Sequence, residues 1–267
     1  MKKISALLLA LVMAVLALSA CGQDKTAQDS STDGSSTSSS SSKEDMGTLT
    51  MATNAEFKPF EYLEGEKVVG ADVDLAEAIA KELGCKLEIT NIDFDAALTG
   101  AATGKYDVAI AGITANDDRK KNMAFSDDYY KASQAIIVAD GSDIKSAKDL
   151  KGKTVSCQEG TTGEQYLLDN EYKVQSFKTG SEAVSALTSG KVDAVVIDNA
   201  VATALSAEQN GKTVVLDEAL TEETYAIATK LGNTELVDKL NKAIAKLKED
   251  GTLNEIFKKY DLPVDAE

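Results

Sequence analysis

The order of its apolar segments constrains the fold of this chain most. From residue 48 onward, short runs of β-forming residues alternate with amphipathic helical patterns. The predicted elements are strands over 48–52, 86–90 and 106–111 and helices over 72–83 and 95–103. Such alternation is typical of a parallel sheet whose faces are covered by helices. The chain is therefore predicted to be an α/β protein.

The helix predicted over residues 72–83 has well-marked ends. Leucine or isoleucine recurs every four residues from Leu75 to Leu83, which is the spacing of an apolar stripe that packs on a sheet. We expect Asp72 to cap its N-terminus, because a side-chain oxygen there can accept a free backbone N–H. Gly84 is expected to end the helix, because glycine readily adopts the left-handed conformation of a C-terminal cap.

A similar arrangement recurs about 86 residues later. Thr-Gly-Lys-Tyr-Asp at 103–107 precedes one apolar strand, and Ser-Gly-Lys-Val-Asp at 189–193 precedes the strand 194–197. These strands end in polar residues, at 112–114 and at 198–199. Ligands of open α/β sheets bind at such strand ends. Two sheets that face each other across a cleft would bring both ends onto one small molecule.

These patterns predict that the folded part of the chain has two lobes. Lobe 1 is expected to comprise residues 48–133 and 226–267, and lobe 2 residues 134–225. The apolar strands 134–139 and 225–229 stand where the chain would cross between the lobes. They are therefore candidate hinge strands.

The N-terminal part of the chain has a different composition. Two lysines, an apolar run over 4–18 and small residues follow one another, so residues 1–20 are predicted to be a signal peptide. The sequence Leu-Ser-Ala-Cys at 18–21 resembles the lipobox of bacterial lipoproteins, which makes Cys21 the expected lipidation site and membrane anchor. An ordinary signal peptide with an incidental cysteine is the alternative. Residues 21–47 are rich in Ser, Asp and Gln and are predicted to be a disordered tether.

Composition narrows the functional classes. The chain has 44 acidic and 28 basic side chains and a formal net charge of −16, which argues against nucleic acid as a partner. It has no histidine, so His-based catalytic triads, general bases and metal sites are excluded. Cys85 and Cys157 fall in different halves and are interpreted as buried or partly buried thiols. We expect neither a cofactor nor a metal, and a monomeric protein that is not an enzyme.

Arg119 is the only arginine among the 28 basic residues. A guanidinium is a planar, permanently charged fork that can hold a carboxylate through two hydrogen bonds, which an ammonium cannot do. We therefore take Arg119 as the candidate for carboxylate recognition. The alternative is a surface arginine that occurs by chance in a lysine-rich chain.

Several motifs follow one another along most of residues 48–262. They are Asn54-Ala55-Glu56-Phe57-Lys58-Pro59-Phe60-Glu61-Tyr62, Val69-Gly70-Ala71-Asp72-Val73-Asp74-Leu75, Ala111-Gly112-Ile113-Thr114 with Arg119, Phe125-Ser126-Asp127, Leu150-Lys151-Gly152-Lys153 with Gly160-Thr161-Thr162-Gly163, and Asp193-Ala194 with Asp198. In this order they resemble the extracytoplasmic solute-binding proteins of polar amino acid ABC transporters. The resemblance implies the type II periplasmic binding protein fold, with two Rossmann-like lobes joined by two crossover strands. It also implies a lipoprotein that delivers a free L-amino acid to a membrane permease and its ATPase.

The resemblance further implies how an amino acid is held. Arg119 would bind the α-carboxylate, together with Thr114 and a backbone N–H at Thr162. The α-ammonium would contact the carbonyl of Gly112, the Thr114 hydroxyl and Asp198. A buried, ionised Asp198 needs a cation as its partner, and the ammonium provides one. An N-cap of the following helix is a second role open to Asp198.

Side-chain selection is expected at further positions. Phe57 and Phe94 match aromatic positions that sandwich the ligand. Asn54 stands where some members have an aspartate, which disfavours a basic ligand, whereas Gln158 is like that of some arginine-binding members. Basic and neutral polar amino acids therefore both stay open. The predicted ligand-binding set is Asn54, Phe57, Phe94, Ala111, Gly112, Thr114, Arg119, Gln158, Thr161, Thr162 and Asp198, with Glu56 as a further selecting residue.

Two other functions are compatible with this fold. A dehydratase-like enzyme would need a general acid or base in the cleft, for which only Asp198, Glu56 and Cys157 are candidates, and none has an obvious partner. A ligand sensor would pass the closure of its lobes to a separate signalling protein.

Overall fold

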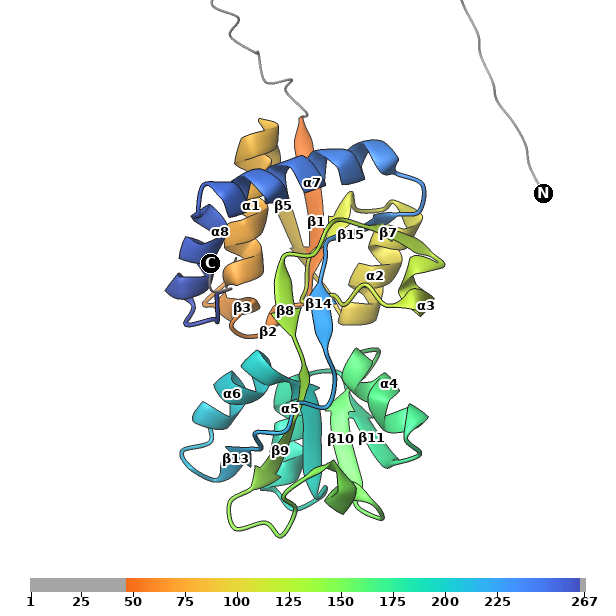
Figure 1. Cartoon of the computed structure of the whole chain (residues 1–267), viewed down its shortest axis with the longest axis vertical. Helices are drawn as coiled ribbons and strands as arrows, with labels where there is room; N and C mark the ends of the chain where they lie inside the picture. The colour runs from red at the N-terminus through yellow and green to blue at the C-terminus, as the bar shows by residue number, and fades with distance from the viewer. Residues whose placement is uncertain (1–46, 265–267) are drawn as a thin grey trace, which may run out of the picture. The chain divides into compact units, whose positions relative to one another are not determined.

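The computed structural model of the chain describes residues 47–264 (Figure 1). Its strands are β1 (Thr48–Thr53), β2 (Glu56–Phe57), β3 (Glu61–Glu64), β4 (Lys67–Val69), β5 (Lys86–Asn91), β6 (Val108–Ala109), β7 (Met123–Phe125), β8 (Tyr130–Ala132), β9 (Gln134–Ala139), β10 (Thr154–Gln158), β11 (Lys173–Phe177), β12 (Ala194–Asp198), β13 (Thr213–Val215), β14 (Glu223–Tyr225) and β15 (Ala228–Lys230). Its helices are α1 (Ala71–Leu83), α2 (Phe94–Thr103), α3 (Asp117–Lys120), η1 (Ala147–Leu150), α4 (Thr162–Asp169), α5 (Gly180–Thr188), α6 (Asn199–Ala207), α7 (Thr234–Glu249) and α8 (Thr252–Lys259).

The first five-stranded sheet has the order β5-β1-β6-β15-β7. β1 is parallel to β5 and β6, and β15 runs antiparallel to β6 and β7. Side chains alternate between its faces, since Val108 packs in the cluster under α1, α7 and α8 whereas Ala109 packs in the cluster with α2. Helices therefore cover both faces of this sheet, which is the core of the first lobe.

The second five-stranded sheet has the order β11-β10-β12-β9-β13. β10 is parallel to β11 and β12, and β9 is antiparallel to β12 and β13. Alternate residues of β12 pack in different clusters, with Val195 in the larger cluster and Val196 in the one that includes Leu167 of α4. The predicted α/β class with two lobes is confirmed.

The two sheets are connected by a pair of antiparallel strands, β8 and β14 (Figure 1). Tyr130 of β8 is paired with Tyr225 of β14. The strands predicted to cross at 134–139 and 225–229 are therefore misplaced, because β9 is an inner strand of the second sheet and β15 belongs to the first. An apolar run such as 135–139 is what a strand buried on both faces requires.

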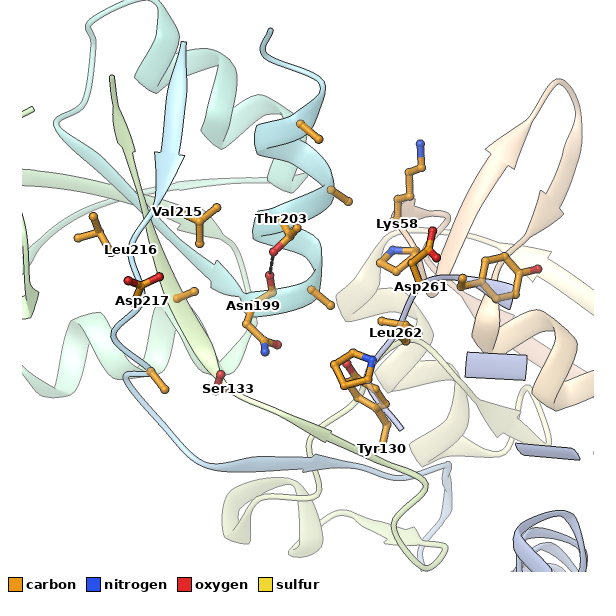
Figure 2. A pocket seen from close by; sticks show the side chains of 18 of the residues that line it. Lys58, Tyr130, Ser133, Asn199, Thr203, Val215, Leu216, Asp217, Asp261 and Leu262 are labelled. Atoms are coloured by element: carbon orange, nitrogen blue, oxygen red, sulfur yellow. Dashed lines mark hydrogen bonds between the residues drawn. The ribbon is translucent and has the colours of Figure 1, made fainter. Parts of the chain in front are cut away.

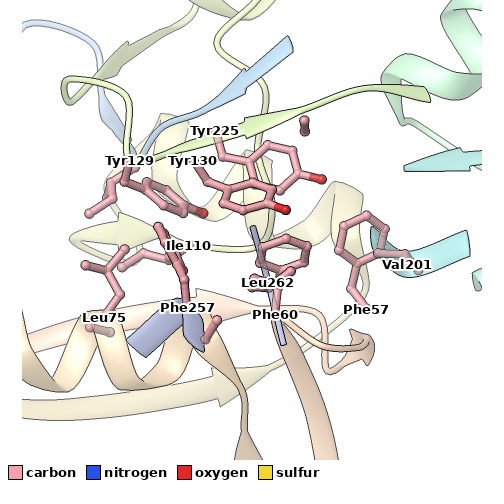
Figure 3. Packing of buried hydrophobic residues seen from close by; sticks show 14 of the residues in the cluster. Phe57, Phe60, Leu75, Ile110, Tyr129, Tyr130, Val201, Tyr225, Phe257 and Leu262 are labelled. Atoms are coloured by element: carbon pink, nitrogen blue, oxygen red, sulfur yellow. The ribbon is translucent and has the colours of Figure 1, made fainter. Parts of the chain in front are cut away.

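An aromatic cluster holds the crossover strands against the first lobe (Figure 3). The ring of Phe60 packs edge-on against Tyr130 at 5.0 Å and against Tyr225 at 5.1 Å between ring centroids. Tyr130 in turn packs edge-on against Phe257 of α8 at 5.2 Å. Each such pair contributes about 0.5–1.5 kcal/mol beyond the burial of its area.

The first helix differs from its prediction at one end. It ends as expected at Gly84, whose φ of 72° is left-handed. It begins at Ala71, however, and Asp72 lies inside the first turn with its side chain fully buried, so the predicted N-cap role is wrong. Gly70 precedes the helix with a φ of 134°, and an added Cβ there would overlap the carbonyl of Phe60.

Several predictions lie outside the described residues. These are the signal peptide at 1–20, the lipidated Cys21 and nearly all of the tether. Within residues 47–264, no helix is long and apolar enough to cross a membrane, and no group of His, Cys, Asp or Glu is arranged to hold a metal ion. Cys157 is buried and Cys85 is partly buried, as predicted.

Candidate functional site

A cavity lies where the ends of strands from the two sheets meet. Ten of the eleven predicted ligand-binding residues line it, and Glu61 lines it as well. The lining residues are Asn54, Phe57, Glu61, Phe94, Ala111, Gly112, Arg119, Gln158, Thr161, Thr162 and Asp198. The remaining predicted residue, Thr114, lies behind Arg119 and does not line the cavity.

Strand ends and helix starts place these side chains. Ala111 and Gly112 follow β6, Gln158 ends β10 and Asp198 ends β12. Phe94 is the first residue of α2. In open α/β sheets the carboxyl ends of the strands are where ligands bind, and here both sheets direct such ends toward one cavity.

The guanidinium of Arg119 is held by backbone carbonyls from both lobes. Nη1 donates to the carbonyl of Thr114 at 2.9 Å, and Nη2 donates to the carbonyl of Gly160 at 3.0 Å. The guanidinium carbon also lies 5.4 Å from the centre of the Phe94 ring. Burial lowers the pKa of Arg119, and the charge of Asp198 opposes that shift. Because arginine stays protonated in proteins, these contacts fix a permanent positive charge at the cavity.

Asp198 places a carboxyl at the same cavity. It is 3% exposed and accepts a hydrogen bond from the Tyr225 hydroxyl. Burial, followed by the charge of Glu223, raises its pKa to about 6. Asp198 does stand at the N-cap position of α6, but its side chain makes no capping hydrogen bond. Its carboxyl is therefore directed to the cavity.

Asp72 supports the cavity wall and was assigned to a helix cap by sequence reasoning. Its Oδ2 accepts hydrogen bonds from the Gly112 N–H at 2.8 Å and the Tyr129 hydroxyl at 2.9 Å. Gly112 has a φ of 54°, and an added Cβ would lie 2.7 Å from the Phe57 ring. Burial raises the pKa of Asp72 to about 6. An acidic residue in a helix's first turn is common, so the sequence carried no signal for this inward role.

Glu223 was also missed by sequence reasoning. It lies on the crossover strand β14, and its Oε2 accepts hydrogen bonds from the hydroxyls of Thr114 at 2.6 Å and Thr162 at 2.7 Å. Its Oε1 accepts from the Thr221 hydroxyl at 2.7 Å. Thr114 belongs to the first lobe and Thr162 begins α4 of the second, so one carboxylate connects both lobes. The predicted contact of Thr114 with a ligand stays a prediction.

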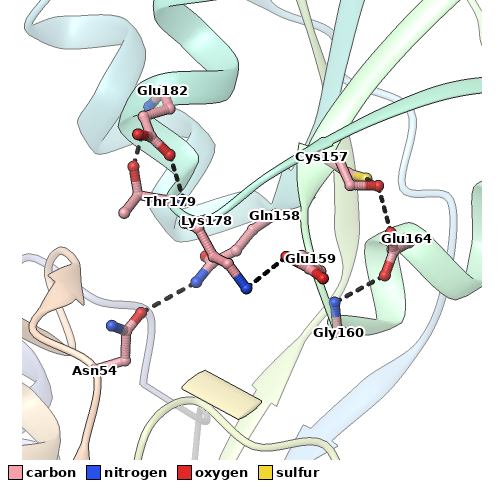
Figure 4. Close-up of polar contacts among 10 residues, drawn as sticks. Asn54, Cys157, Gln158, Glu159, Gly160, Glu164, Lys178, Thr179 and Glu182 are labelled. Atoms are coloured by element: carbon pink, nitrogen blue, oxygen red, sulfur yellow. Dashed lines mark hydrogen bonds and ion pairs between the residues drawn. The ribbon is translucent and has the colours of Figure 1, made fainter. Parts of the chain in front are cut away.

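Further contacts join the lobes around the cavity. The Gln158 side-chain amide donates to Asn54 Oδ1 at 3.1 Å (Figure 4). Lys58 and Glu208, which do not line this cavity, form an ion pair at 3.1 Å, and Glu208 directly follows α6. The lobes are therefore closed on the cavity in this structure.

A second, more open groove lies beside α6 (Figure 2). It is lined by the alanines of α6, by Tyr130 and by the C-terminal segment 260–263. It includes none of the predicted ligand-binding residues. The smaller cavity, with its partly buried guanidinium and its buried carboxyl, has the chemistry of a site for a zwitterion.

Known proteins match the chain over most of its length. The family model "Bacterial extracellular solute-binding proteins, family 3" matches residues 49–263. The arginine-binding extracellular protein ArtP of Bacillus subtilis is 35% identical over 217 residues, which are 79% of this chain and 85% of ArtP. The glutamine-binding protein GlnH of the same organism is 31% identical over 267 residues, which are 97% of each chain.

Solved structures of amino acid-binding proteins also match this chain. An ancestral arginine-binding protein, solved with arginine and with glutamine, is 46% identical with a TM-score of 0.76, over 80% of this chain and 97% of that one. The ancestral amino acid-binding protein AncCDT-1, a precursor of cyclohexadienyl dehydratase, is 35% identical with a TM-score of 0.74. The match covers 80% of this chain and 95% of that one. An enzyme relative therefore exists on this fold. The extent of the family match shows that the chain belongs to the bacterial extracellular solute-binding proteins, family 3.

Proposed function

We propose that this protein is the substrate-binding component of an ABC importer and captures a free, basic or neutral polar L-amino acid between its lobes. One observation carries this proposal: a partly buried guanidinium and a buried carboxyl line the same closed cavity. Arg119 would bind the α-carboxylate, and Asp198 would bind the α-ammonium. The names of relatives that bind arginine and glutamine support this class of ligand.

Closure of the lobes makes these contacts strong. Water is excluded, so each charge of the ligand is paired by the protein and each buried charge of the protein is paired by the ligand. The α-ammonium would lower the pKa of Asp198 again, because an opposite charge favours the ionised form. The hinge is the crossover pair β8 and β14, and opening would release the ligand to the permease.

The same proposal covers location and partners. Cys21 is the proposed lipid anchor, which would hold a monomeric protein at the outer face of the cell membrane. The Ser-rich residues 22–47 would act as a tether of on the order of 25–30 Å. A membrane permease with a cytosolic ATPase is the proposed partner. Metabolic labelling with a palmitate analogue should mark the native protein and not Cys21→Ser.

The test is a thermal-shift screen against the twenty L-amino acids and cystine. A ligand at 100 times its dissociation constant stabilises the folded state by about 2.7 kcal/mol, which is a shift of several degrees. Arg119→Ala should remove the shift, because breaking a buried charge pair costs about 3–5 kcal/mol. Lys120→Ala, the exposed neighbour on α3, is the matched control. If no amino acid stabilises the protein, the proposal is wrong.

Catalysis is the second candidate, because a dehydratase precursor shares the fold and the cavity contains carboxyls of raised pKa. A carboxyl that stays protonated near neutral pH can act as a general acid. Incubation of the protein with each stabilising compound, followed by mass spectrometry, should return the compound unchanged. Turnover would favour the enzyme instead.

A further inference from the structure

The hydroxyl of Tyr225 is a buried polar group directly behind the cavity. Tyr225 ends the crossover strand β14, is 0% exposed and does not line the cavity. Its hydroxyl donates a hydrogen bond to the carboxyl of Asp198, which does line it. A buried tyrosine hydroxyl needs a partner, and here the partner is the carboxyl that the proposed function assigns to the α-ammonium.

Two further contacts place Tyr225 behind the segment that follows β6. Its backbone forms an isolated β-bridge with Thr114. An added Cβ on Gly112 would lie 3.3 Å from the Tyr225 ring. Each of the three residues predicted to hold the α-ammonium, Gly112, Thr114 and Asp198, is therefore next to this tyrosine.

Aromatic packing sets the direction of the Tyr225 hydroxyl (Figure 3). The ring packs edge-on against Phe60 at 5.1 Å between centroids, and it lies tilted against Tyr130 at 5.5 Å and Tyr129 at 6.2 Å. Phe60 belongs to the first lobe, whereas Asp198 ends β12 of the second. The hydroxyl therefore extends from the aromatic cluster at the crossover strands to a carboxyl of the other lobe.

The surroundings of Asp198 oppose its negative charge. The charged and titratable groups that act on it or respond to it are Glu223 and Tyr225 of β14, Glu61 of β3, Arg119 of α3 and Tyr130 of β8. Burial, and then the charge of Glu223, raises the pKa of Asp198 to about 6, and hydrogen bonds from Tyr225 and Gln134 oppose this rise. Burial, and then the charge of Asp198, raises the pKa of Tyr225 well above its ordinary value, so its hydroxyl keeps its proton and acts as a donor.

We propose that Tyr225 is a positioning residue of this site, whose hydroxyl orients Asp198 and keeps it ionised for the α-ammonium of an amino acid. This rests on the proposed function, which assigns the α-ammonium to Asp198. Tyr225→Phe keeps the ring and its packing and removes only the donor. Asp198 then holds its proton to higher pH, and the ammonium has no counter-charge there until that proton leaves.

The test measures the affinity of the native protein and of Tyr225→Phe for L-arginine and L-glutamine by titration calorimetry, from about pH 6 to about pH 8.5. A hydrogen bond to a charged group is equivalent to about one to two pH units, so Asp198 in the variant should titrate at about pH 7–8. Affinity should therefore fall about 5- to 50-fold at pH 6 but less than about threefold at pH 8.5. Both amino acids should lose the same factor, because both carry the α-ammonium.

Proton release on binding is a readout that a merely structural role would not change. At pH 7 about a tenth of the native Asp198 carries a proton, given its pKa of about 6, whereas about half to nine-tenths of it should in Tyr225→Phe. L-arginine titrated at pH 7 in two buffers of different ionisation enthalpy should therefore release about 0.4–0.8 of a proton more from the variant. Release from other carboxyls cancels in this difference.

Tyr130→Phe is the matched control. It removes a hydroxyl from the residue paired with Tyr225 on the opposite crossover strand. The pH profile and the proton release of this control should be those of the native protein. Urea denaturation at pH 8.5 checks that both variants are folded.

Two outcomes would overturn the inference. An affinity that Tyr225→Phe leaves unchanged at pH 6, or lowers by the same factor at every pH, would give the hydroxyl no role in the ionisation of Asp198. Equal proton release from the variant and the native protein at pH 7 would do the same. Either result leaves the proposed function intact. If the native protein binds no amino acid, the proposed function itself fails, and the inference fails with it.

Discussion

The carboxylate of Glu223 should hold the lobes of this protein together. From the crossover strand it accepts hydroxyl hydrogen bonds from Thr114 in one lobe and Thr162 in the other, at 2.6 and 2.7 Å. Opening the lobes separates these two threonines, so at least one bond exists only in the closed state. The substitution Glu223→Gln keeps the shape of the side chain and one oxygen but removes the charge.

The magnitude follows from the contacts. A hydrogen bond to a charged acceptor contributes about 1.5–3 kcal/mol, so the bond that opening breaks contributes at most about 3 kcal/mol. Charge-assisted bonds are roughly twice as strong as neutral ones, so the glutamine should lose about half of this, at most about 1.5 kcal/mol. The closed population should then fall by at most about tenfold relative to the open one.

Titration calorimetry and small-angle X-ray scattering measure the two consequences. Because the effect acts on closure, the dissociation constants of Glu223→Gln for L-arginine and L-glutamine should rise by the same factor, at most about ten. The ligand-free variant should also have a larger radius of gyration. Glu222→Gln is the matched control, since it removes the same charge from the exposed neighbouring residue. Unchanged affinities, or a loss confined to one of the two amino acids, would refute the reasoning.

Three further predictions test other parts of the structure. Gly160→Ala should weaken ligand binding several-fold, because its Cβ would overlap Asp95 Oδ1 from the other lobe, and Asp95→Ala in the same chain should restore part of the loss in a binding titration. The free energy of unfolding of the ligand-free protein should fall as the pH rises from about 4 to about 6. The pKa values of Asp72 and Asp198 are raised to about 6 in the folded state, which therefore keeps protons that the unfolded chain has already lost. The fall should be roughly 3 kcal/mol for each carboxyl, and a level profile in urea denaturation over this range would contradict it. Leu240→Ala, at a fully buried position of α7, should lower the free energy of unfolding by about 2–5 kcal/mol in the same assay.

Much of the site could be predicted because its residues stand in local motifs. The segment 111–114 and the turn at 160–163 are short stretches whose order along the chain is informative. Glu61 and Asp72 lie within such motifs as well, yet their inward direction depends on how β3 and α1 pack, which no local pattern specifies. Glu223 stands in a Glu-Glu pair of a strongly acidic chain, so nothing local distinguished it.

The crossover strands were misplaced for a related reason. β8 and β14 pair across more than ninety residues of sequence, and each is only three residues long. Period-two patterns need longer runs to be visible. The strands with strong apolar runs, such as β9, are by contrast those buried inside a sheet.

The position of β15 has a consequence for the order in which the molecule can be assembled. This strand, at residues 228–230, is inserted between β6 and β7, which are more than one hundred residues earlier in the chain. The first sheet therefore has a gap until nearly all of the chain has been synthesised. The strands of the second sheet all lie within residues 134–215, so this sheet can form first. The first lobe, whose sheet begins with β1, is therefore completed last, when β15 is inserted.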